Sequence, residues 1–278
     1  MKIGLALGGG GVRGLAHIPL LQILEEEGVT PVAVAGTSMG ALVGACIAHG
    51  WESHELRNRV ERHVFLPGGG LSQLREKGRD LSRWLGFFGL TRAKGAFFSA
   101  DGFVRYLLEA LEASEFEDLT LPFHAVAADF TTGRKVVFTD GPLLPALKAS
   151  IAIPGVFEPV RHQGRLLVDG GVADNVPWSA LEPSCDAVIA IDVASENDGS
   201  DCGQDPDAIE SFVSVFQRMI ARTTYQRLAL DPPALYFRPR ISGVRGLDFG
   251  LIPKVFDQAD ADSERFRSEV RTLLSSLR

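Results

Sequence analysis

Two short apolar runs open the chain, and each is followed by a glycine-rich turn and a helical pattern. The runs cover residues 3–7 and 32–35, and neither contains a charged residue. After the first turn, apolar residues recur at positions 15, 18, 21 and 24, which is the spacing of one helix face. A strand, a turn and a helix that occur twice in succession predict parallel strands in an α/β sheet. Pro19 stands near the first turn of the first helix and predicts a late start or a mild kink there.

Coarser patterns after residue 100 predict the rest of the sheet and its C-terminal flank. Short apolar runs bounded by turn residues indicate strands, and apolar spacings of three and four indicate helices. The predicted elements are strands over residues 121–128, 136–138 and 187–191, a hairpin over 160–168, a helix over 209–220, an edge strand over 235–237 and one amphipathic helix over 255–278.

Composition places the chain among ordinary globular proteins. It has 278 residues, of which 45% are hydrophobic and 23% are charged. These values exclude a disordered or fibrous chain. Because no linker long enough to divide the chain is present, we predict a single domain over residues 1–278, with a cap insertion at 65–99 and a C-terminal helical extension at 208–278.

Charge and cysteine usage limit the function classes. The formal net charge of −7 argues against a non-specific nucleic-acid binder, whose binding surface is basic, although it leaves room for a local basic patch against a membrane. The three cysteines form no C-x-x-C pair, so the sequence predicts neither a disulfide framework nor a zinc site and favours a reducing compartment. Residues 28–50 carry no Lys, Arg, Asp or Glu, but proline and glycines interrupt them, which indicates a buried strand, turn and helix rather than a membrane span.

Residues 36–40, Gly-Thr-Ser-Met-Gly, show the most specific pattern in the chain. They match G-x-S-x-G between an apolar strand and a helix, which is the context of a nucleophilic serine. Ser38 at the apex of so tight a turn requires neighbours without Cβ atoms, and Gly36 and Gly40 meet that requirement. The N-terminus of the following helix would supply unpaired N–H groups that favour a developing alkoxide. The alternative is a tight turn whose serine only caps the helix.

A second glycine-rich turn, over residues 9–14, also lies between a strand and a helix. Backbone N–H groups in such a loop point at an anion, which suits dinucleotide binding, phosphate binding or an oxyanion hole. A dinucleotide fold requires an acidic residue about 20 positions further on, and none occurs from residue 28 to residue 50. A P-loop requires Gly-Lys, a dipeptide that the chain lacks. The oxyanion hole remains, and a simple turn is its alternative.

The group that activates Ser38 is less clearly marked. A hydrolase triad of the α/β type has the order Ser, acid, His, and no histidine follows Asp169. His124 and His162 follow Ser38, but one lies early in a predicted strand and the other in a predicted hairpin tip. Asp169 ends an apolar strand and precedes two glycines, so we expect it at the carboxyl edge of the sheet, where it can form a Ser-Asp dyad. An aspartate that only caps a turn is the alternative, and the rival carboxylates are Asp129, Asp140 and Asp192.

Three turns of the chain together resemble the motifs of patatin-like phospholipases, in particular those of the bacterial and neuropathy-target-esterase-like branch. The motifs are Gly9-Gly10-Gly11-Val12-Arg13-Gly14, Gly36-Thr37-Ser38-Met39-Gly40 and Asp169-Gly170-Gly171. Supporting stretches cover residues 15–18, 129–133, 149–157 and 174–177. The resemblance extends over about the first 190 residues and is loose beyond them, and its combined motifs are highly specific.

The resemblance implies a three-layer α/β/α sandwich with a mostly parallel central sheet. It also implies that Ser38 is the nucleophile and that Asp169 accepts its proton. The oxyanion hole would consist of Gly9, Gly10 and Gly11, with Arg13 in the same loop. The implied reaction is hydrolysis of a fatty-acid ester, such as a phospholipid or lysophospholipid, through an acyl-serine intermediate, with no metal and no other cofactor.

Two other functions use the same fold. An acyltransferase would share the acyl-serine step and pass the acyl group to an acceptor other than water, and a non-catalytic lipid-binding module would need neither Ser38 nor Asp169. Residues 65–99 hold several aromatic side chains and a local charge of +4, which suits a mobile cap that meets lipid tails and head groups or an ordinary folded insertion. We expect a cytoplasmic protein in peripheral contact with the inner face of the membrane.

Overall fold

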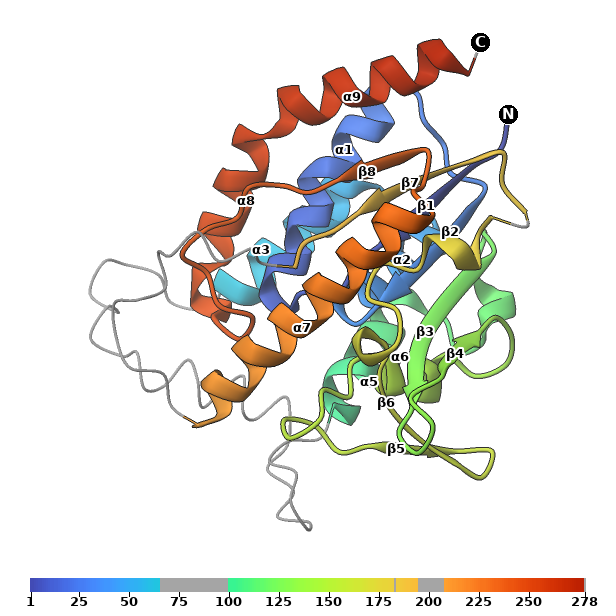
Figure 1. The fold of residues 1–278 in the computed structure, drawn as a ribbon, viewed down its shortest axis with the longest axis vertical. Coiled ribbons are helices and arrows are strands. Elements are labelled where there is room, and N and C mark those ends of the chain that lie inside the picture. Colours follow the sequence, from blue (N-terminus) through green and yellow to red (C-terminus); the bar gives the residue numbers. More distant parts are fainter. Residues whose placement is uncertain (66–99, 183, 195–207, 278) are drawn as a thin grey trace.

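The structure is a computed structural model that describes residues 1–65, 100–182, 184–194 and 208–277. Its centre is an eight-stranded sheet in which the strands follow the order β5-β6-β3-β2-β1-β7-β8, with β4 paired to β3 (Figure 1). The strands are β1 (Ile3–Leu7), β2 (Ala33–Thr37), β3 (Phe123–Asp129), β4 (Lys135–Phe138), β5 (Val160–His162), β6 (Arg165–Asp169), β7 (Ala187–Ile191) and β8 (Leu235–Phe237).

The sheet is mixed, and its two halves differ in strand direction. From β3 through β2, β1 and β7 to β8, all neighbouring strands are parallel. The pairs β3–β4, β3–β6 and β5–β6 are antiparallel. The predicted parallel sheet is therefore confirmed for the five strands that include both N-terminal units, and the predicted hairpin is β5–β6.

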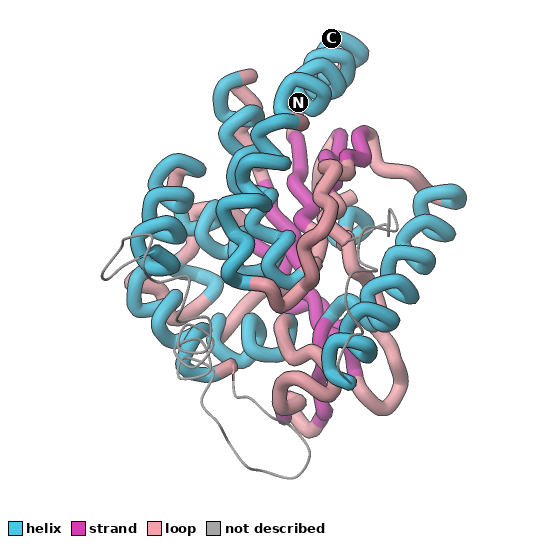
Figure 2. Tube along the Cα trace, turned by 90° about the vertical axis from the view of Figure 1, so that its left-hand side faces the viewer, coloured by secondary structure: helices cyan, strands magenta, loops and turns pink. Residues whose placement is uncertain are grey.

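Helices flank the sheet on both faces, which confirms the three-layer sandwich. Figure 2 shows the strands between a thick helical layer and the single long helix α7. The helices are α1 (His17–Glu26), α2 (Met39–His49), α3 (Ser53–Phe65), α5 (Asp101–Leu111), α6 (Leu143–Ser150), α7 (Ala208–Leu230), α8 (Ile252–Ala261) and α9 (Ser263–Ser276). None of the helices in the described ranges is both long and apolar enough to cross a membrane.

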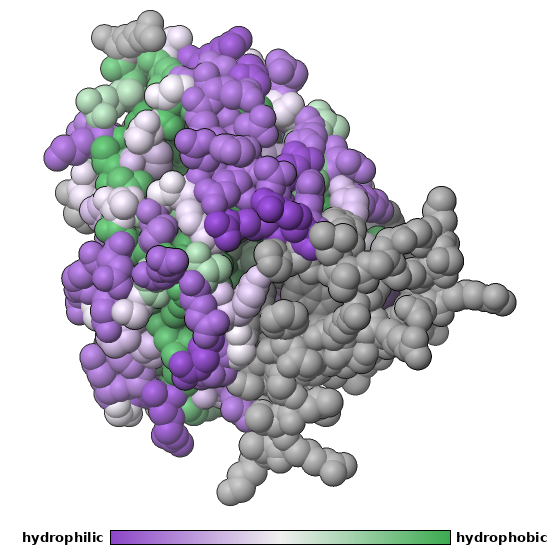
Figure 3. Space-filling model, turned by 180° about the vertical axis from the view of Figure 1, so that it is seen from behind, coloured by the Kyte–Doolittle hydropathy of each residue, from purple (hydrophilic) through white to green (hydrophobic). Residues whose placement is uncertain are grey.

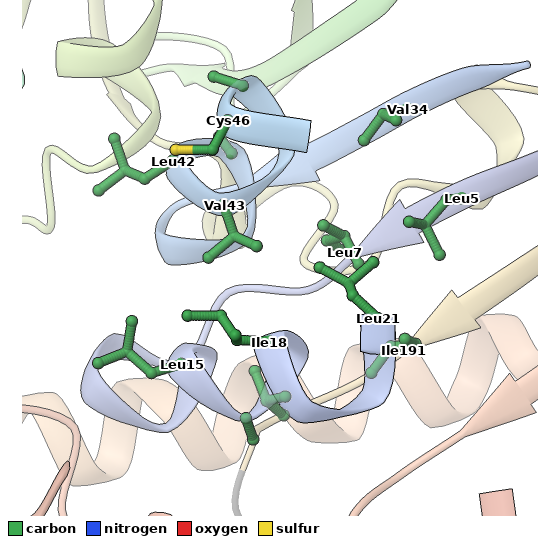
Figure 4. Close-up of a cluster of buried hydrophobic side chains, with 14 of the residues drawn as sticks. Leu5, Leu7, Leu15, Ile18, Leu21, Val34, Leu42, Val43, Cys46 and Ile191 are labelled. Atoms are coloured by element: carbon green, nitrogen blue, oxygen red, sulfur yellow. The ribbon is translucent and has the colours of Figure 1, made fainter. Parts of the chain in front are cut away.

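The alternation of side chains along the strands makes the two faces of the sheet unequal. Leu5 and Leu7 of β1 and Ile191 of β7 point into the large core beneath α1 and α2, where Ile18 and Val43 meet them (Figure 4). Because successive strand residues face opposite sides, the other face carries mainly small residues. They are Ala6, Ala33, Ala35 and Ala190, which pack with Val188, Val176, Trp178 and Leu181. The small residues let residues 173–181 lie directly on the sheet.

The outer surface of the thick layer is mainly hydrophilic, with hydrophobic side chains between the polar ones (Figure 3). This is the usual pattern of amphipathic helices that bury one stripe and expose the other. On α9, for example, Phe266 and Val270 are fully buried while Arg271 and Thr272 lie at the surface.

Two sequence predictions about helices have different outcomes. The predicted late start near Pro19 is confirmed, because a 3₁₀ turn, η1 (Gly11–Ala16), precedes α1 and places Pro19 in the first turn of the α-helix. The single C-terminal helix is wrong: α8 and α9 are separate and meet at Asp262. The Asp262 carboxylate accepts hydrogen bonds from the Arg240 N–H at 2.8 Å and from Arg265 at 2.6 Å, which fixes the corner.

The C-terminal part of the chain is not only helical. It contains α7, α8 and α9, but also β8, which adds the predicted edge strand beside β7. The predicted cap at 65–99 falls almost entirely on residues 66–99, which lie outside the described residues.

Candidate active site

Ser38 occupies a strained turn between β2 and α2. Its backbone has φ 55° and ψ −125°, a left-handed region that a residue with a Cβ rarely adopts. A Cβ on Gly36 would lie 2.4 Å from the Gly40 carbonyl oxygen, and one on Gly40 would lie 2.2 Å from the Leu7 carbonyl oxygen. The close approach of three backbone segments therefore leaves no room for a Cβ at either glycine beside Ser38.

A second serine holds this turn in place. The Ser38 N–H donates to Ser150 Oγ at 2.9 Å, and the Ser150 hydroxyl donates to the Val126 carbonyl at 2.7 Å. Ser150 is fully buried at the end of α6. It belongs to one of the stretches that supported the resemblance, but no sequence pattern assigns it this role, because its partners are a main-chain amide and a main-chain carbonyl.

Asp169 lies at the same level as Ser38, on the other side of β3. Thr37, the residue before Ser38, is opposite Val126 of β3, and Asp169 is opposite the next β3 residue, Ala127. Asp169 lies beside the carboxyl end of β3, as expected, but it reaches that position on an antiparallel strand rather than a parallel one. A Cβ on Gly170 would lie 2.3 Å from the Val126 carbonyl oxygen, so the chain can turn across β3 here only with glycine.

The Asp169 carboxylate is buried, and its Oδ1 accepts the Gly171 N–H at 2.7 Å. This bond and the nearby Ser38 hydroxyl favour the charged form and act to lower the pKa. Burial has the larger effect and raises the pKa of Asp169 to about 6. The structure therefore brings the predicted serine and carboxylate together in a site where the carboxylate takes up a proton more readily than an exposed aspartate.

The glycine-rich turn lies against Ser38 as predicted, but its three glycines have different roles. A Cβ on Gly9 would lie 2.9 Å from the Ser38 Cβ, so Gly9 provides space next to the serine. The Gly9 N–H donates to the Asn175 carbonyl at 3.2 Å. Within the described ranges, the N–H groups of Gly10 and Gly11 have no acceptor. The amides that are left for an anion are thus those of Gly10 and Gly11, next to the N-terminus of α2.

Two side chains that the sequence analysis did not single out hold the glycine-rich turn. Asn175 Nδ2 donates to the Gly9 carbonyl at 3.1 Å, and His17 Nε2 donates to the Gly8 carbonyl at 2.8 Å. Complete burial lowers the pKa of His17 to about 4, so the ring is neutral and keeps that N–H across the physiological range. Both residues lie in stretches that supported the resemblance, which is the only signal in the sequence that marks them.

Arg13 lies in the same loop, as predicted, but its side chain is engaged elsewhere. The guanidinium donates to the Val244 carbonyl at 3.1 Å and to Gln217 Oε1 at 2.6 Å, and the side chain is buried. These bonds direct the charge toward the C-terminal part of the chain. Arg13 therefore supports the turn that bears the glycine amides.

The rival groups from the sequence analysis have other surroundings. The Asp129 carboxylate accepts the N–H groups of Thr131 and Thr132 at 2.9 Å each, which is a turn cap. His162 lies on the edge strand β5, where its ring stacks edge-on against Phe138. His124 lies at the start of β3, far along the strand from Asp129. Of the predicted candidates, the structure joins only Asp169 to Ser38.

A serine in a strained turn, a buried carboxylate and two backbone amides without acceptors among the described residues meet at one edge of a mixed sheet in this α/β fold. Residues 5–181 match the family model of patatin-like phospholipases. The chain belongs to the patatin-like phospholipase family, as the three motifs predicted.

Relatives of this chain agree with the predicted branch. An uncharacterized NTE family protein of Mycobacterium tuberculosis is 34% identical over 227 residues, which is 80% of this chain and 56% of that protein. Lysophospholipase nte1 of Neosartorya fischeri is 27% identical over an alignment of 293 positions, gaps included, which covers 97% of this chain and 18% of that protein. The chain thus spans about a fifth of the length of the fungal relative and just over half of the mycobacterial one.

A solved structure has the same fold. VipD from Legionella pneumophila aligns with a TM-score of 0.52 over 96% of this chain and 66% of that chain, at 13% sequence identity. The likeness supports the arrangement of sheet and helices described above, and at this identity it says nothing about the reaction.

Proposed function

We propose that this protein is a serine lipid acyl hydrolase that uses Ser38 as its nucleophile and Asp169 as its general base. The observation that carries the proposal is that Ser38 and the buried Asp169 lie next to each other across β3, where the pKa of Asp169 is raised to about 6. A carboxylate with this pKa is mostly ionised at pH 7, yet it is a stronger base than an ordinary aspartate, whose pKa is 3.8.

The first half of the reaction forms an acyl-serine. Ser38 Oγ attacks the ester carbonyl carbon while Asp169 accepts the hydroxyl proton. The carbonyl oxygen becomes an oxyanion that accepts hydrogen bonds from the Gly10 and Gly11 amides, close to the positive end of the α2 dipole. The bond from the carbonyl carbon to the alcohol oxygen then breaks, and Asp169 returns the proton to the departing alcohol.

The second half releases the acid. A water molecule attacks the acyl-serine carbonyl and gives its proton to Asp169, and the same amides hold the second oxyanion. The bond between the acyl carbon and Ser38 Oγ breaks, the fatty acid leaves, and Ser38 Oγ recovers the proton from Asp169. The neutral His17 and Asn175 keep the glycine-rich turn in place throughout both halves by their bonds to the Gly8 and Gly9 carbonyls.

The substrate class that we propose is the fatty-acid ester of a phospholipid or lysophospholipid. Membership in the patatin-like phospholipase family supports it, and so does the similarity to proteins named lysophospholipase. We further propose a peripheral contact with the lipid surface. It is supported by three apolar side chains of α7 that remain 47%, 54% and 65% exposed, those of Phe212, Val215 and Met219.

Labelling with a fluorophosphonate tests the nucleophile, and a lipid panel tests the reaction. We expect the wild type to bind the probe covalently and to release fatty acid from lysophospholipid. Ser38→Ala should do neither, and Asp169→Asn should be severely impaired in both. A wild type that is folded but neither reacts with the probe nor releases fatty acid would exclude the proposal. Transfer of the acyl group to an added lysolipid or alcohol in preference to water would favour the acyltransferase instead.

A further inference from the structure

The glycine-rich turn is bonded to a part of the chain more than 230 residues away in sequence. The Val12 N–H donates to the Gly246 carbonyl at 2.8 Å. Gly11, with φ +59°, lies so close to this carbonyl that a Cβ on it would be 2.0 Å from the Gly246 oxygen. The backbone that follows Gly10 and Gly11 therefore rests directly on the backbone of residues 244–246.

The Arg13 side chain adds a second connection in the same direction. It is 2% exposed, and it donates to the Val244 carbonyl at 3.1 Å and to Gln217 Oε1 of α7 at 2.6 Å. Gln217 also lies against Gly246, where a Cβ would come within 2.3 Å of Gln217 Nε2. Gln217 thus contacts both Arg13 and the segment on which Gly11 rests. We call Gln217 and residues 244–246 the C-terminal clamp.

We infer that Arg13 and Gln217 are positioning residues, which hold the Gly10 and Gly11 amides in place by fastening their turn to the C-terminal clamp. The inference rests on the proposed function, because it assigns the clamp to the oxyanion hole of that reaction. A buried guanidinium requires acceptors, and here the acceptors come from α7 and from residue 244, so the direction of the turn depends on where α7 lies. The clamp lies beyond residues 5–181, so the part of the chain that matches the family model does not contain it.

A test of the clamp needs a variant that removes the acceptor without disturbing the turn itself. Gln217→Ala removes the oxygen that accepts from Arg13, whereas Gln217→Glu keeps an acceptor at the same place. Gln226→Ala is the matched control, because Gln226 is an exposed glutamine of the same helix. Losing a whole oxyanion donor lowers kcat by 10²–10³-fold, so a donor that is displaced but still present should lower it by roughly tenfold.

We expect Gln217→Ala to lower kcat on a soluble short-chain ester by about tenfold with KM within about twofold, and to slow fluorophosphonate labelling to the same degree. Gln217→Glu and Gln226→Ala should stay within about twofold of the wild type. A merely structural role for Gln217 would instead lower the midpoint of thermal unfolding and leave the labelling rate per folded molecule unchanged. That result, or a Gln217→Glu as impaired as Gln217→Ala, would overturn the inference.

Amide hydrogen exchange separates the clamp from the proposed function, because it needs no substrate. In Gln217→Ala, the peptide that covers residues 8–16 should exchange several-fold faster than in the wild type and in Gln226→Ala. Unchanged exchange in that peptide would overturn the clamp even if the wild type is an active hydrolase. Faster exchange would support the clamp as a support of the turn even if the wild type fails to react with the probe, a failure that would count against the proposed function alone.

Discussion

Two buried carboxylates, one at the end of β6 and one directly after β7, have opposite surroundings. Asp192, directly after β7, is fully buried and accepts hydrogen bonds from the Tyr236 hydroxyl and the Arg238 guanidinium, and from the Ala194 N–H at 2.9 Å. Asp169, at the end of β6, is 3% exposed. It accepts a hydrogen bond from the Gly171 N–H and lies beside the Ser38 hydroxyl, and no ion pair with it occurs among the residues that the structure describes.

This difference separates a carboxylate that joins two strands from the one that we propose as the base. At Asp192 the Arg238 guanidinium balances the buried charge, and the group joins β7 to β8. At Asp169 only neutral donors offset the burial, so the pKa is raised to about 6. A group that is poised to take and return a proton is what the proposed reaction requires. Five measurements can break or sharpen this comparison.

Replacement of Asp169 should have the largest effect on activity. Asp169→Asn keeps the shape and an acceptor for the Gly171 N–H but cannot take the Ser38 proton, so kcat on a soluble ester should fall by about 10²–10⁴-fold. Steady-state kinetics against wild type, with the fold checked by circular dichroism, measure the loss. A kcat within tenfold of wild type would remove Asp169 from the role of base.

The same variant should be more stable than the wild type at pH 7. Because the folded-state pKa of about 6 lies above the ordinary value of 3.8, the folded state keeps the proton to higher pH than the unfolded state. The stability that this group contributes is therefore lost as the pH rises from about 4 to about 6. An asparagine does not ionise, so Asp169→Asn does not lose this stability. Its free energy of unfolding in urea should exceed that of the wild type by roughly 1–3 kcal/mol at pH 7, and the difference should vanish near pH 4.

The matched change at Asp192 should act on stability in the opposite direction. Asp192→Asn removes the carboxylate charge that pairs with the Arg238 guanidinium, whose side chain is 14% exposed. Breaking a buried pair on one side costs about 3 kcal/mol. Urea unfolding at pH 7 should show a loss of that order, in contrast to the gain for Asp169→Asn. Equal shifts in the two variants would mean that the two carboxylates do not differ in the way described.

The pH profile of the wild type should report the protonation of Asp169. Because the base must be ionised, kcat/KM should fall about tenfold per pH unit below about pH 6 and should be level above it until another group titrates. The measurement uses a soluble ester between pH 4.5 and pH 8. A profile that stays level down to pH 4.5 would mean that the pKa of the essential carboxylate is not raised.

A third buried carboxylate, Asp174, should show the smallest effect. It is paired with Lys135 at 2.8 Å and also with Arg227, which lies over the Trp178 ring. Because Lys135 is one-third exposed and Arg227 remains, Lys135→Met should lower the free energy of unfolding by only about 1 kcal/mol or less and leave kcat unchanged. A loss of unfolding free energy as large as that of Asp192→Asn would show that Lys135, rather than Arg227, is the main partner of Asp174.

Much of the fold, and the turn that bears Ser38, could be predicted because the constraints are local, whereas Asp169 is distinguished from its rival carboxylates only by the resemblance to the family's motifs. A serine in a strained turn requires glycine at positions 36 and 40, and the sequence displays both. The short, continuously apolar runs likewise place β1, β2 and β7 without reference to the rest of the chain. The direction of β6 could not be predicted in this way, since an apolar run looks the same whether its strand is parallel or antiparallel.

The supporting residues of the site could not be predicted because their partners are main-chain atoms. Ser150, Asn175 and His17 bond to backbone groups of Ser38, Gly9 and Gly8, and a backbone partner leaves no complementary side chain in the sequence. The direction of Arg13 depends on residues 217 and 244, which no local pattern connects with the glycine-rich turn. The corner at Asp262 depends in the same way on a bond to residue 240.

The alanine-rich face of the sheet determines how closely residues 173–181 can approach Ser38 and the glycine-rich turn. Residues 173–181 sit on Ala6, Ala35 and Ala190, and from that height Asn175 reaches the Gly9 carbonyl. Each extra methyl group on these alanines would push residues 173–181 away from the sheet. The Asn175 side chain would then move away from the glycine-rich turn that it holds. On this face, side-chain volume therefore sets the distance between residues 173–181 and the sheet, and with it the geometry of the proposed site. The leucines and isoleucines of the opposite face contribute mainly to the free energy of unfolding.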